Sequence, residues 1–253
     1  MATMSEENKR KVVIPGEEIV SGDGYLPGEN TEKRSNGGIV ALRYGLAEEL
    51  NKLVKVIPLS GSYTPRRGNV VIGKVELLTG NGWVFDFGGA ENGFLPLAEV
   101  PRYVNQNAMD EVFRIGDLAV LKIWNIGGRG IDFTIKSRGL GRIDDGIIFK
   151  INPNKVPRVI GKEGSMIKLI KDNTNCDITV GQNGYIWIIG DKVEDELFAR
   201  KAIEYVVENS FTEGLTESFE NWFEGQGIKV RKSSPTENSE ENYEDEMEEE
   251  NDN

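Results

Sequence analysis

Hydrophobic and polar positions alternate over short stretches in the first half of the chain and repeat at helical spacing in the last third. Between Val12 and Arg67, Pro-Gly, Gly-Asp-Gly and Gly-Gly turns separate short apolar runs such as VVIPGEEIV and KLVKVIPLSGSY, which is typical of a small β domain. From Gly68 onward we expect five strands: VVIGKVELL, GWVFDF, NGFLPL, DLAVLKIWNI and GIDFTIK. A long connection precedes the fourth, so the pattern predicts a small Greek-key barrel of the OB type.

After Asp144 the pattern becomes a mixture of strands and helices. GIIFKI predicts a strand, and a short helix runs from Asn152-Pro153 to Ile160. The stretch SMIKLIKDNT resumes as a helix. CDITV and YIWIIG then predict two strands joined around Asn183-Gly184, a strong hairpin signal. The element order is therefore strand, short helix, loop, helix, strand, strand.

Two further helices are expected at the end of this region. Asp191 is followed by Glu194 three residues later, the spacing of a capping box at a helix start. Apolar residues follow at helical spacing in a second segment, and we expect them to pack in a core: Leu215, Phe219, Trp222 and Phe223.

Composition excludes several kinds of chemistry. The chain of 253 residues has no histidine and one cysteine, so His-ligated metals, intrachain disulfides and Cys-based zinc sites are excluded. Cys176 is expected to be a small core residue. The N-terminal segment has no apolar signal region and no run is long enough to cross a bilayer, so we expect a soluble, cytoplasmic protein without a cofactor.

The net charge of −12 is unevenly distributed. Residues 233–253 hold ten acidic residues and no basic ones, a composition that predicts a disordered tail. Two windows, 121–142 and 150–171, are basic instead, with a single acidic residue in each. Local positive charge of this kind attracts phosphate backbones.

The stretch VIGKEGSMIKLI, residues 159–170, carries the main candidate site. A Gly-x-x-Gly loop between two helices lets a phosphodiester backbone approach closely, and the N-terminus of the second helix favours its charge. The alternative is that the glycines only relieve crowding at a turn. We expect RNA contacts from the loop and its flanks: Arg158, Ile160, Gly161, Lys162, Glu163, Gly164, Ile167 and Lys168.

This segment resembles the KH domain, whose Gly-x-x-Gly loop clamps single-stranded RNA; Glu163 departs from the basic or neutral residue that would bind best. The middle unit resembles the RNA-binding OB domain of the largest protein of the bacterial small ribosomal subunit. The positions where that family stacks bases hold Asn81, Val84 and Pro96 here. Phosphate attraction is therefore expected instead from four basic residues: Lys74, Arg129, Lys136 and Arg138.

The motifs GYLPGE and PLSGSYTPRRGNVVIGKV, followed by the barrel and the KH segment, resemble the KH-containing RNA-binding cap subunits of the archaeal exosome. This resemblance implies a non-catalytic protein. Three copies would sit on a hexameric ring of RNase PH-like subunits and guide single-stranded 3′ ends into it for phosphorolytic degradation. A free-standing RNA-binding regulator of transcription or translation remains the alternative.

The expected architecture is a multidomain β and α+β protein with four parts. Residues 1–67 form an N-terminal β domain that docks on the ring, and 68–139 form the OB-type barrel. Residues 140–232 form the KH domain with its C-terminal helices, and 233–253 form the acidic tail.

Overall fold

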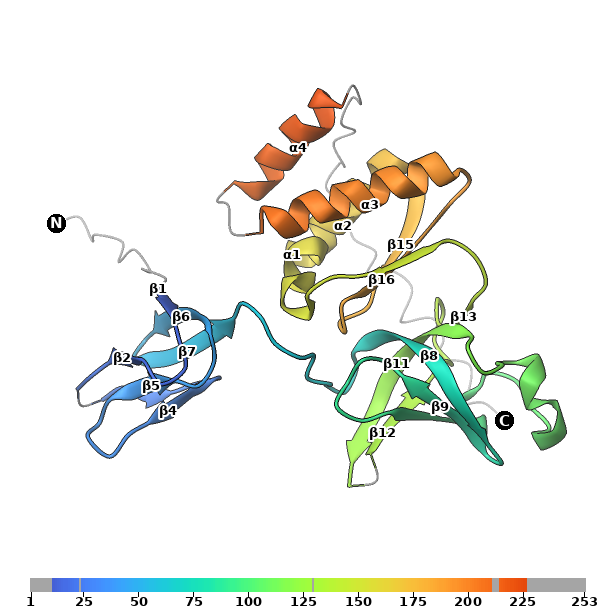
Figure 1. The fold of residues 1–253 in the computed structure, drawn as a ribbon, viewed down its shortest axis with the longest axis horizontal. Coiled ribbons are helices and arrows are strands. Elements are labelled where there is room, and N and C mark those ends of the chain that lie inside the picture. The colour runs from blue at the N-terminus through green and yellow to red at the C-terminus, as the bar shows by residue number, and fades with distance from the viewer. Residues whose placement is uncertain (1–10, 23, 129, 211–213, 227–253) are drawn as a thin grey trace, which may run out of the picture. The chain divides into compact units, whose positions relative to one another are not determined.

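The computed structural model describes residues 11–22, 24–128, 130–210 and 214–226 (Figure 1). The described residues form two compact units. The first unit comprises the residues up to Pro157 together with Thr179–Ile188. The second comprises Arg158–Ile178 and the residues from Ile189 onward. The predicted acidic tail, 233–253, lies outside the described residues.

The N-terminal region of the first unit consists of two small sheets. One has the strand order β1-β6-β7-β3 and the other has the order β2-β5-β4. Gly45 lies where two strands approach closely, because an added Cβ would be 2.3 Å from the carbonyl oxygen of Ile57. The strands are β1 (Lys11–Val13), β2 (Glu18–Val20), β3 (Leu26–Pro27), β4 (Thr31–Lys33), β5 (Ile39–Ala41), β6 (Gly45–Leu50) and β7 (Leu53–Pro58).

A closed five-stranded barrel follows. Its strands are β8 (Val70–Thr79), β9 (Gly82–Asp86), β10 (Gly93–Pro96), β11 (Leu118–Gly127) and β12 (Gly130–Thr134). The sheet order is β12-β10-β9-β8-β11, and a further pairing of β12 with β11 closes the ring. Strands β10 and β12 are parallel and the other neighbours are antiparallel. The short strand β13 (Gly141–Ile143) continues the sheet beside β11. The OB-type barrel that the alternation predicted is confirmed.

Aromatic side chains fill the interior of this barrel. Trp83, Phe85 and Phe87 are at most 1 % exposed, and edge-to-face contacts join them to Phe113 or Phe133. The long connection before β11 contains two 3₁₀ helices, η1 (Leu97–Glu99) and η2 (Gln106–Glu111). The indole nitrogen of Trp83 donates a hydrogen bond to the carbonyl of Phe113 at 3.1 Å. These rings are therefore core residues and cannot stack on RNA bases.

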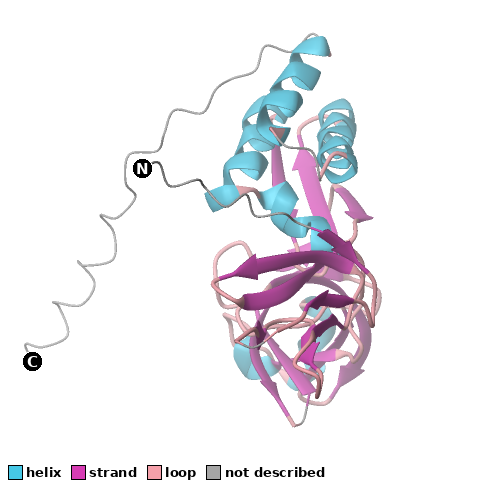
Figure 2. Ribbon diagram, turned by 90° about the vertical axis from the view of Figure 1, so that its left-hand side faces the viewer, coloured by secondary structure: helices cyan, strands magenta, loops and turns pink. Residues whose placement is uncertain are grey.

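The C-terminal region has the predicted order of strands and helices. Its elements are β14 (Ile147–Lys150), η3 (Pro153–Lys155), α1 (Val156–Ile160), η4 (Lys162–Gly164), α2 (Ser165–Thr174), β15 (Cys176–Val180), β16 (Tyr185–Gly190), α3 (Val193–Glu208) and α4 (Leu215–Gly225). The three strands form one sheet in the order β14-β16-β15. In the second unit α2 packs against α3, and α3 against α4; Figure 2 shows these helices as a group.

The helices of the second unit are held by an apolar core. Phe219 and Phe223 are buried, and Trp222 stacks on Tyr205 with ring centroids 4.9 Å apart, as the helical spacing predicted. Cys176 is buried, and burial raises the pKa of its thiol. The predicted capping box at Asp191 is wrong. The N-cap position of α3 is occupied by Lys192, whose side chain makes no capping hydrogen bond.

The turn between β15 and β16 is attached to the barrel within the first unit. Asn183 is 1 % exposed, and its amide nitrogen donates to the carbonyls of Ile72 and Phe87, each at 2.7 Å. The neighbouring Gln182 exchanges two bonds with Val70, from N to O at 2.8 Å and from Val70 N to its side-chain oxygen at 2.6 Å. One backbone bond and several side-chain bonds thus tie the turn to Val70 and Ile72 of β8.

Candidate nucleic-acid interface

The Gly-x-x-Gly loop joins two helices through three residues with positive φ. Helix α1 ends at Ile160, and Gly161 has φ 77° and ψ 178°. Glu163 (φ 53°) and Gly164 (φ 77°) are in the left-handed helical region, and α2 begins at Ser165. No side chain caps α2 at Gly164, so the loop directs the helix start, with its partial positive charge, toward its open side.

The two glycines have different roles. A Cβ at Gly161 would lie 2.7 Å from the backbone nitrogen of Met166 and 2.8 Å from its Cβ, closer than atoms can approach without rearrangement. A Cβ at Gly164 would meet only Ile167, at 3.9 Å. Gly161 is therefore required by packing, whereas Gly164 keeps open space in front of the helix. The alternative explanation, that the glycines only relieve crowding at a turn, therefore fits Gly161 but not Gly164.

The second helix is fixed by its apolar side. Met166, Leu169 and Ile170 are buried, and the amide of Asn173 donates to the carbonyl of Leu169 at 2.8 Å. Since α2 cannot rotate without exposing these side chains, the loop keeps a defined direction.

The charged residues of the loop face solvent. Arg158, Lys162 and Glu163 are exposed. Ile160, Ile167 and Lys168 are half-buried, and together with the two glycines they complete the predicted site. The structure therefore brings the predicted loop residues together, with two exposed cations against one exposed carboxylate, an arrangement that suits a phosphate backbone better than a neutral ligand. Their role in RNA binding stays a prediction.

The basic residues predicted on the barrel are more dispersed. Lys136 forms an ion pair with Glu99 at 3.2 Å, which reduces its effect on a distant phosphate. Lys74 lies opposite Asp86 in the β8–β9 ladder, whereas Arg138 is exposed after β12. Arg129 lies outside the described residues. The contribution of the predicted barrel residues to RNA binding stays a prediction.

Sequence reasoning missed several exposed aromatic or apolar positions on the barrel. Tyr103, in the connection before β11, is 93 % exposed, and Trp124 on β11 is 41 % exposed. Phe94 lies between Val84 and Asp132 in the ladder and is half-buried. Its place in β10 next to two buried neighbours, Gly93 and Leu95, follows from strand alternation, which could have identified it.

Other kinds of site receive no support from the described residues. Within the four described ranges, acidic and cysteine side chains form no group of three that could hold a metal ion. None of the helices that the structure describes combines the length and the apolar character needed to cross a membrane.

The fold and the loop define a protein that joins a closed five-stranded barrel to a KH domain; residues 146–194 match the KH domain family. The exosome complex component Rrp4 of Methanobrevibacter smithii is 39 % identical over 85 % of this chain and 71 % of its own length. Rrp4 of Nitrosopumilus maritimus is 37 % identical over 87 % of this chain and 98 % of its own. The chain belongs to the Rrp4 family of exosome complex components.

A solved structure supports the same relationship. It is described as that of an exosome complex RNA-binding protein, and it is 31 % identical to this chain with a TM-score of 0.59. The match covers 66 % of this chain and 98 % of the solved one.

Proposed function

We propose that this protein is the non-catalytic RNA-binding cap of an exosome. It recruits single-stranded RNA and guides the 3′ end into a phosphorolytic ring of RNase PH-like subunits, with three caps on each hexameric ring. Membership in the Rrp4 family supports the exosome part of this proposal, because the relatives are named as exosome components. The related structure described as an RNA-binding protein supports the RNA part.

The geometry of the Gly-x-x-Gly loop carries the RNA-binding proposal. An open position at Gly164, the uncapped start of α2 and two exposed cations at one loop are what a phosphodiester backbone needs. Such contacts read the backbone and carry no base information. Binding should therefore depend on salt and little on sequence, which suits a protein that passes any unpaired 3′ end onward.

The N-terminal β region offers a surface for docking. Val12, Leu46 and Ile57 are direct neighbours across β1, β6 and β7. Val12 is 50 % and Ile57 38 % exposed, and Leu46 is half-buried. An apolar row across three adjacent strands is a common feature of protein contact surfaces. We assign this row to the contact with the ring, which makes residues 1–67 the docking domain.

The first test changes the loop at its open glycine. Gly164→Asp places a carboxylate where the phosphate would lie, at a φ that Asp tolerates better than most residues. Single-stranded RNA should bind about tenfold more weakly at fixed salt, the equivalent of one charge-assisted contact. Gly16→Asp is the matched control, because Gly16 has φ 86° and no atom near its Cβ position. Equal affinities of the two variants would contradict the loop clamp.

The second test addresses assembly. Ile57→Glu should prevent co-purification of the full chain with its ring subunits, because a charge within the apolar row opposes burial. Leu77→Glu changes an exposed leucine of β8 (52 % exposed) and serves as the control. RNA binding by the isolated chain should remain. If Ile57→Glu still elutes with the ring, the row is not the docking surface; if wild-type protein elutes alone, the free-standing regulator is favoured.

A further inference from the structure

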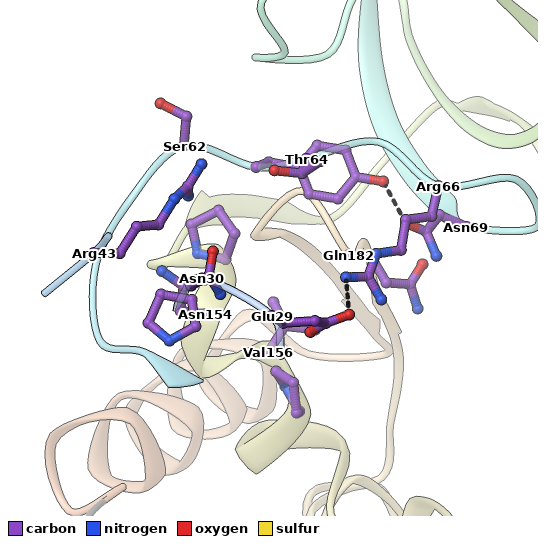
Figure 3. Close-up of a pocket in the computed structure, with 14 residues that line it drawn as sticks. Glu29, Asn30, Arg43, Ser62, Thr64, Arg66, Asn69, Asn154, Val156 and Gln182 are labelled. Carbon is purple, nitrogen blue, oxygen red and sulfur yellow. Dashed lines mark hydrogen bonds and ion pairs between the residues drawn. The ribbon is translucent and has the colours of Figure 1, made fainter. Parts of the chain in front are cut away.

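A polar pocket in the first unit has no role in the function proposed above. Its volume is about 530 Å³, and Figure 3 shows the side chains that line it. They come from four segments that are separate in the sequence: the N-terminal β region, the connection before β8, the residues around η3, and the β15–β16 turn. Residues of the Gly-x-x-Gly loop do not line it.

Hydrogen bonds hold the walls of this pocket. The Asn152 amide donates to the carbonyl of Leu59 at 3.3 Å, which ties η3 to the connection. The Tyr63 hydroxyl donates to Asn69 at 2.7 Å, and burial raises the pKa of Tyr63 to about 12, so the phenol stays neutral at physiological pH. These bonds hold the wall residues in fixed positions around the pocket.

One wall of the pocket contains hydrogen-bond donors without acceptors. The amide nitrogen of Asn154 is buried and has no hydrogen-bond partner among the described residues. Leaving such a buried donor unpaired is unfavourable, because it has lost its bond to water without gaining another. A Cβ built at Gly61, where φ is 146°, would lie 3.8 Å from this nitrogen and 3.4 Å from a guanidinium nitrogen of Arg43. The side-chain nitrogens of Arg43 and Asn154 thus flank the same space, which Gly61 leaves open because it has no side chain.

Charge determines which ligand fits. Glu29 is the one acidic residue among those lining the pocket, and Arg66 pairs with it at 3.4 Å. Arg43 makes no ion pair within the described part of the chain, so its charge is uncompensated. Figure 3 shows its guanidinium beside the segment that carries Ser62. A cation and a buried amide donor suit an anion that accepts hydrogen bonds.

We propose that this pocket binds a phosphate group between Arg43 and Asn154, and that the backbone of single-stranded RNA supplies it. The phosphate chemistry follows from the pocket alone, whereas RNA as its source rests on the proposed function. The pocket then adds a backbone contact outside the KH loop and positions the strand near the N-terminal β region.

The test measures the salt dependence of RNA binding by the full chain. Each phosphate contact with a single strand contributes about 0.7 to the slope of log K against log salt. Arg43→Gln should lower the slope for an oligouridylate by about this amount. Arg34→Gln removes the same charge from the same region at a residue that does not line the pocket, and it should leave the slope unchanged. Equal slopes for the two variants overturn the proposal.

A second measurement follows the side-chain amide of Asn154 by NMR. Inorganic phosphate and the oligouridylate should both shift this resonance, relative to chloride at equal ionic strength. Asn154→Asp is nearly isosteric and puts a carboxylate beside Arg43; it should abolish the phosphate-induced shifts of neighbouring amides and leave stability intact. A shift with phosphate alone supports the phosphate site and overturns RNA as its source. Oligoglutamate serves as a polyanion without phosphate. A shift with oligoglutamate alone, or no shift with inorganic phosphate, the oligouridylate or oligoglutamate, overturns the site.

The outcomes also separate this inference from the proposed function. If RNA binding is lost in Gly164→Asp but the amide of Asn154 never responds, the RNA-binding cap stands and the pocket is not a phosphate site. If inorganic phosphate shifts the amide while the protein does not bind RNA, the pocket stands and the cap function fails.

Discussion

Removing the side chain of Asn183 tests how the β15–β16 turn is attached to the barrel. Asn183→Ala deletes three hydrogen bonds at a position that is 1 % exposed. Two are donated to the carbonyls of Ile72 and Phe87 at 2.7 Å, and the third is accepted from the backbone nitrogen of Ile72 at 3.3 Å. Alanine cannot replace any of them.

The expected cost follows from what remains after the change. Two carbonyls and one amide lose their partner in a buried place, and each unsatisfied group costs about 1–3 kcal/mol. The third bond is long and contributes little, and a water molecule can enter the space that the side chain leaves. We therefore expect a total destabilisation of about 3 kcal/mol.

Two measurements check this value. Urea unfolding of the first unit should shift to a lower midpoint, and hydrogen exchange at the amide of Ile72 should accelerate, because its acceptor is gone. Asn107→Ala is the matched control, since Asn107 is exposed and its loss should change stability by less than about 0.5 kcal/mol. If Asn183→Ala and Asn107→Ala have the same urea midpoint and hydrogen exchange at Ile72 stays slow, the attachment of the turn is energetically unimportant.

Four other substitutions test the loop, the pocket wall and the barrel. Gly161→Ala should destabilise the second unit by about 2 kcal/mol, through the contact with Met166 and the positive φ, and Gly164→Ala by about 1 kcal/mol through φ alone; equal urea midpoints would contradict the distinction. Burial raises the pKa of Tyr63 to about 12. The stabilisation that its neutral phenol contributes is therefore complete below about pH 10 and is lost as the pH rises toward 12. Tyr63→Phe should remove this part of the decline between about pH 10 and 12 in urea unfolding; an unchanged decline would contradict it. Leu95→Ala, at a fully buried position, should cost about 3 kcal/mol in the same assay; a loss below about 1 kcal/mol would mean that the barrel core rearranges.

The sequence predicted the barrel because its strands carry a local signal. The stretch GWVFDF alternates a buried and an outward position, so the interior place of Trp83 and Phe85 follows from the order of residues alone. The start of α3 shows the limit of local rules. Asp191 and Glu194 have the spacing of a capping box, but the carboxylate that bonds near this turn is Glu196, which accepts from the nitrogen of Gly190 at 3.0 Å. A cap depends on backbone geometry, which the spacing does not specify.

Long-range contacts leave no mark in the local pattern. Asn183 was expected from its Asn-Gly pair to form a hairpin turn, and the turn is present. Its bonds to Ile72 join residues 111 positions apart, and nothing near Asn183 indicates that its side chain is buried. The phosphate pocket has the same origin: Arg43, Gly61 and Asn154 have no spacing in common, and only the folded chain places them around one space.

The Gly-x-x-Gly loop shows how far identical letters can differ in function. Gly161 and Gly164 are equivalent letters of one motif, and a test designed on the motif alone would change both together. Because a Cβ at Gly161 would collide with Met166 whereas one at Gly164 would be almost free, the double change would lose RNA binding through misfolding of the loop even if no phosphate ever bound there. A single carboxylate at position 164 leaves the tight turn intact, so a loss of binding in that variant reports on the open side of the loop alone. The structure therefore turns a motif into a testable site by separating the glycine that shapes the loop from the glycine that leaves room for a ligand.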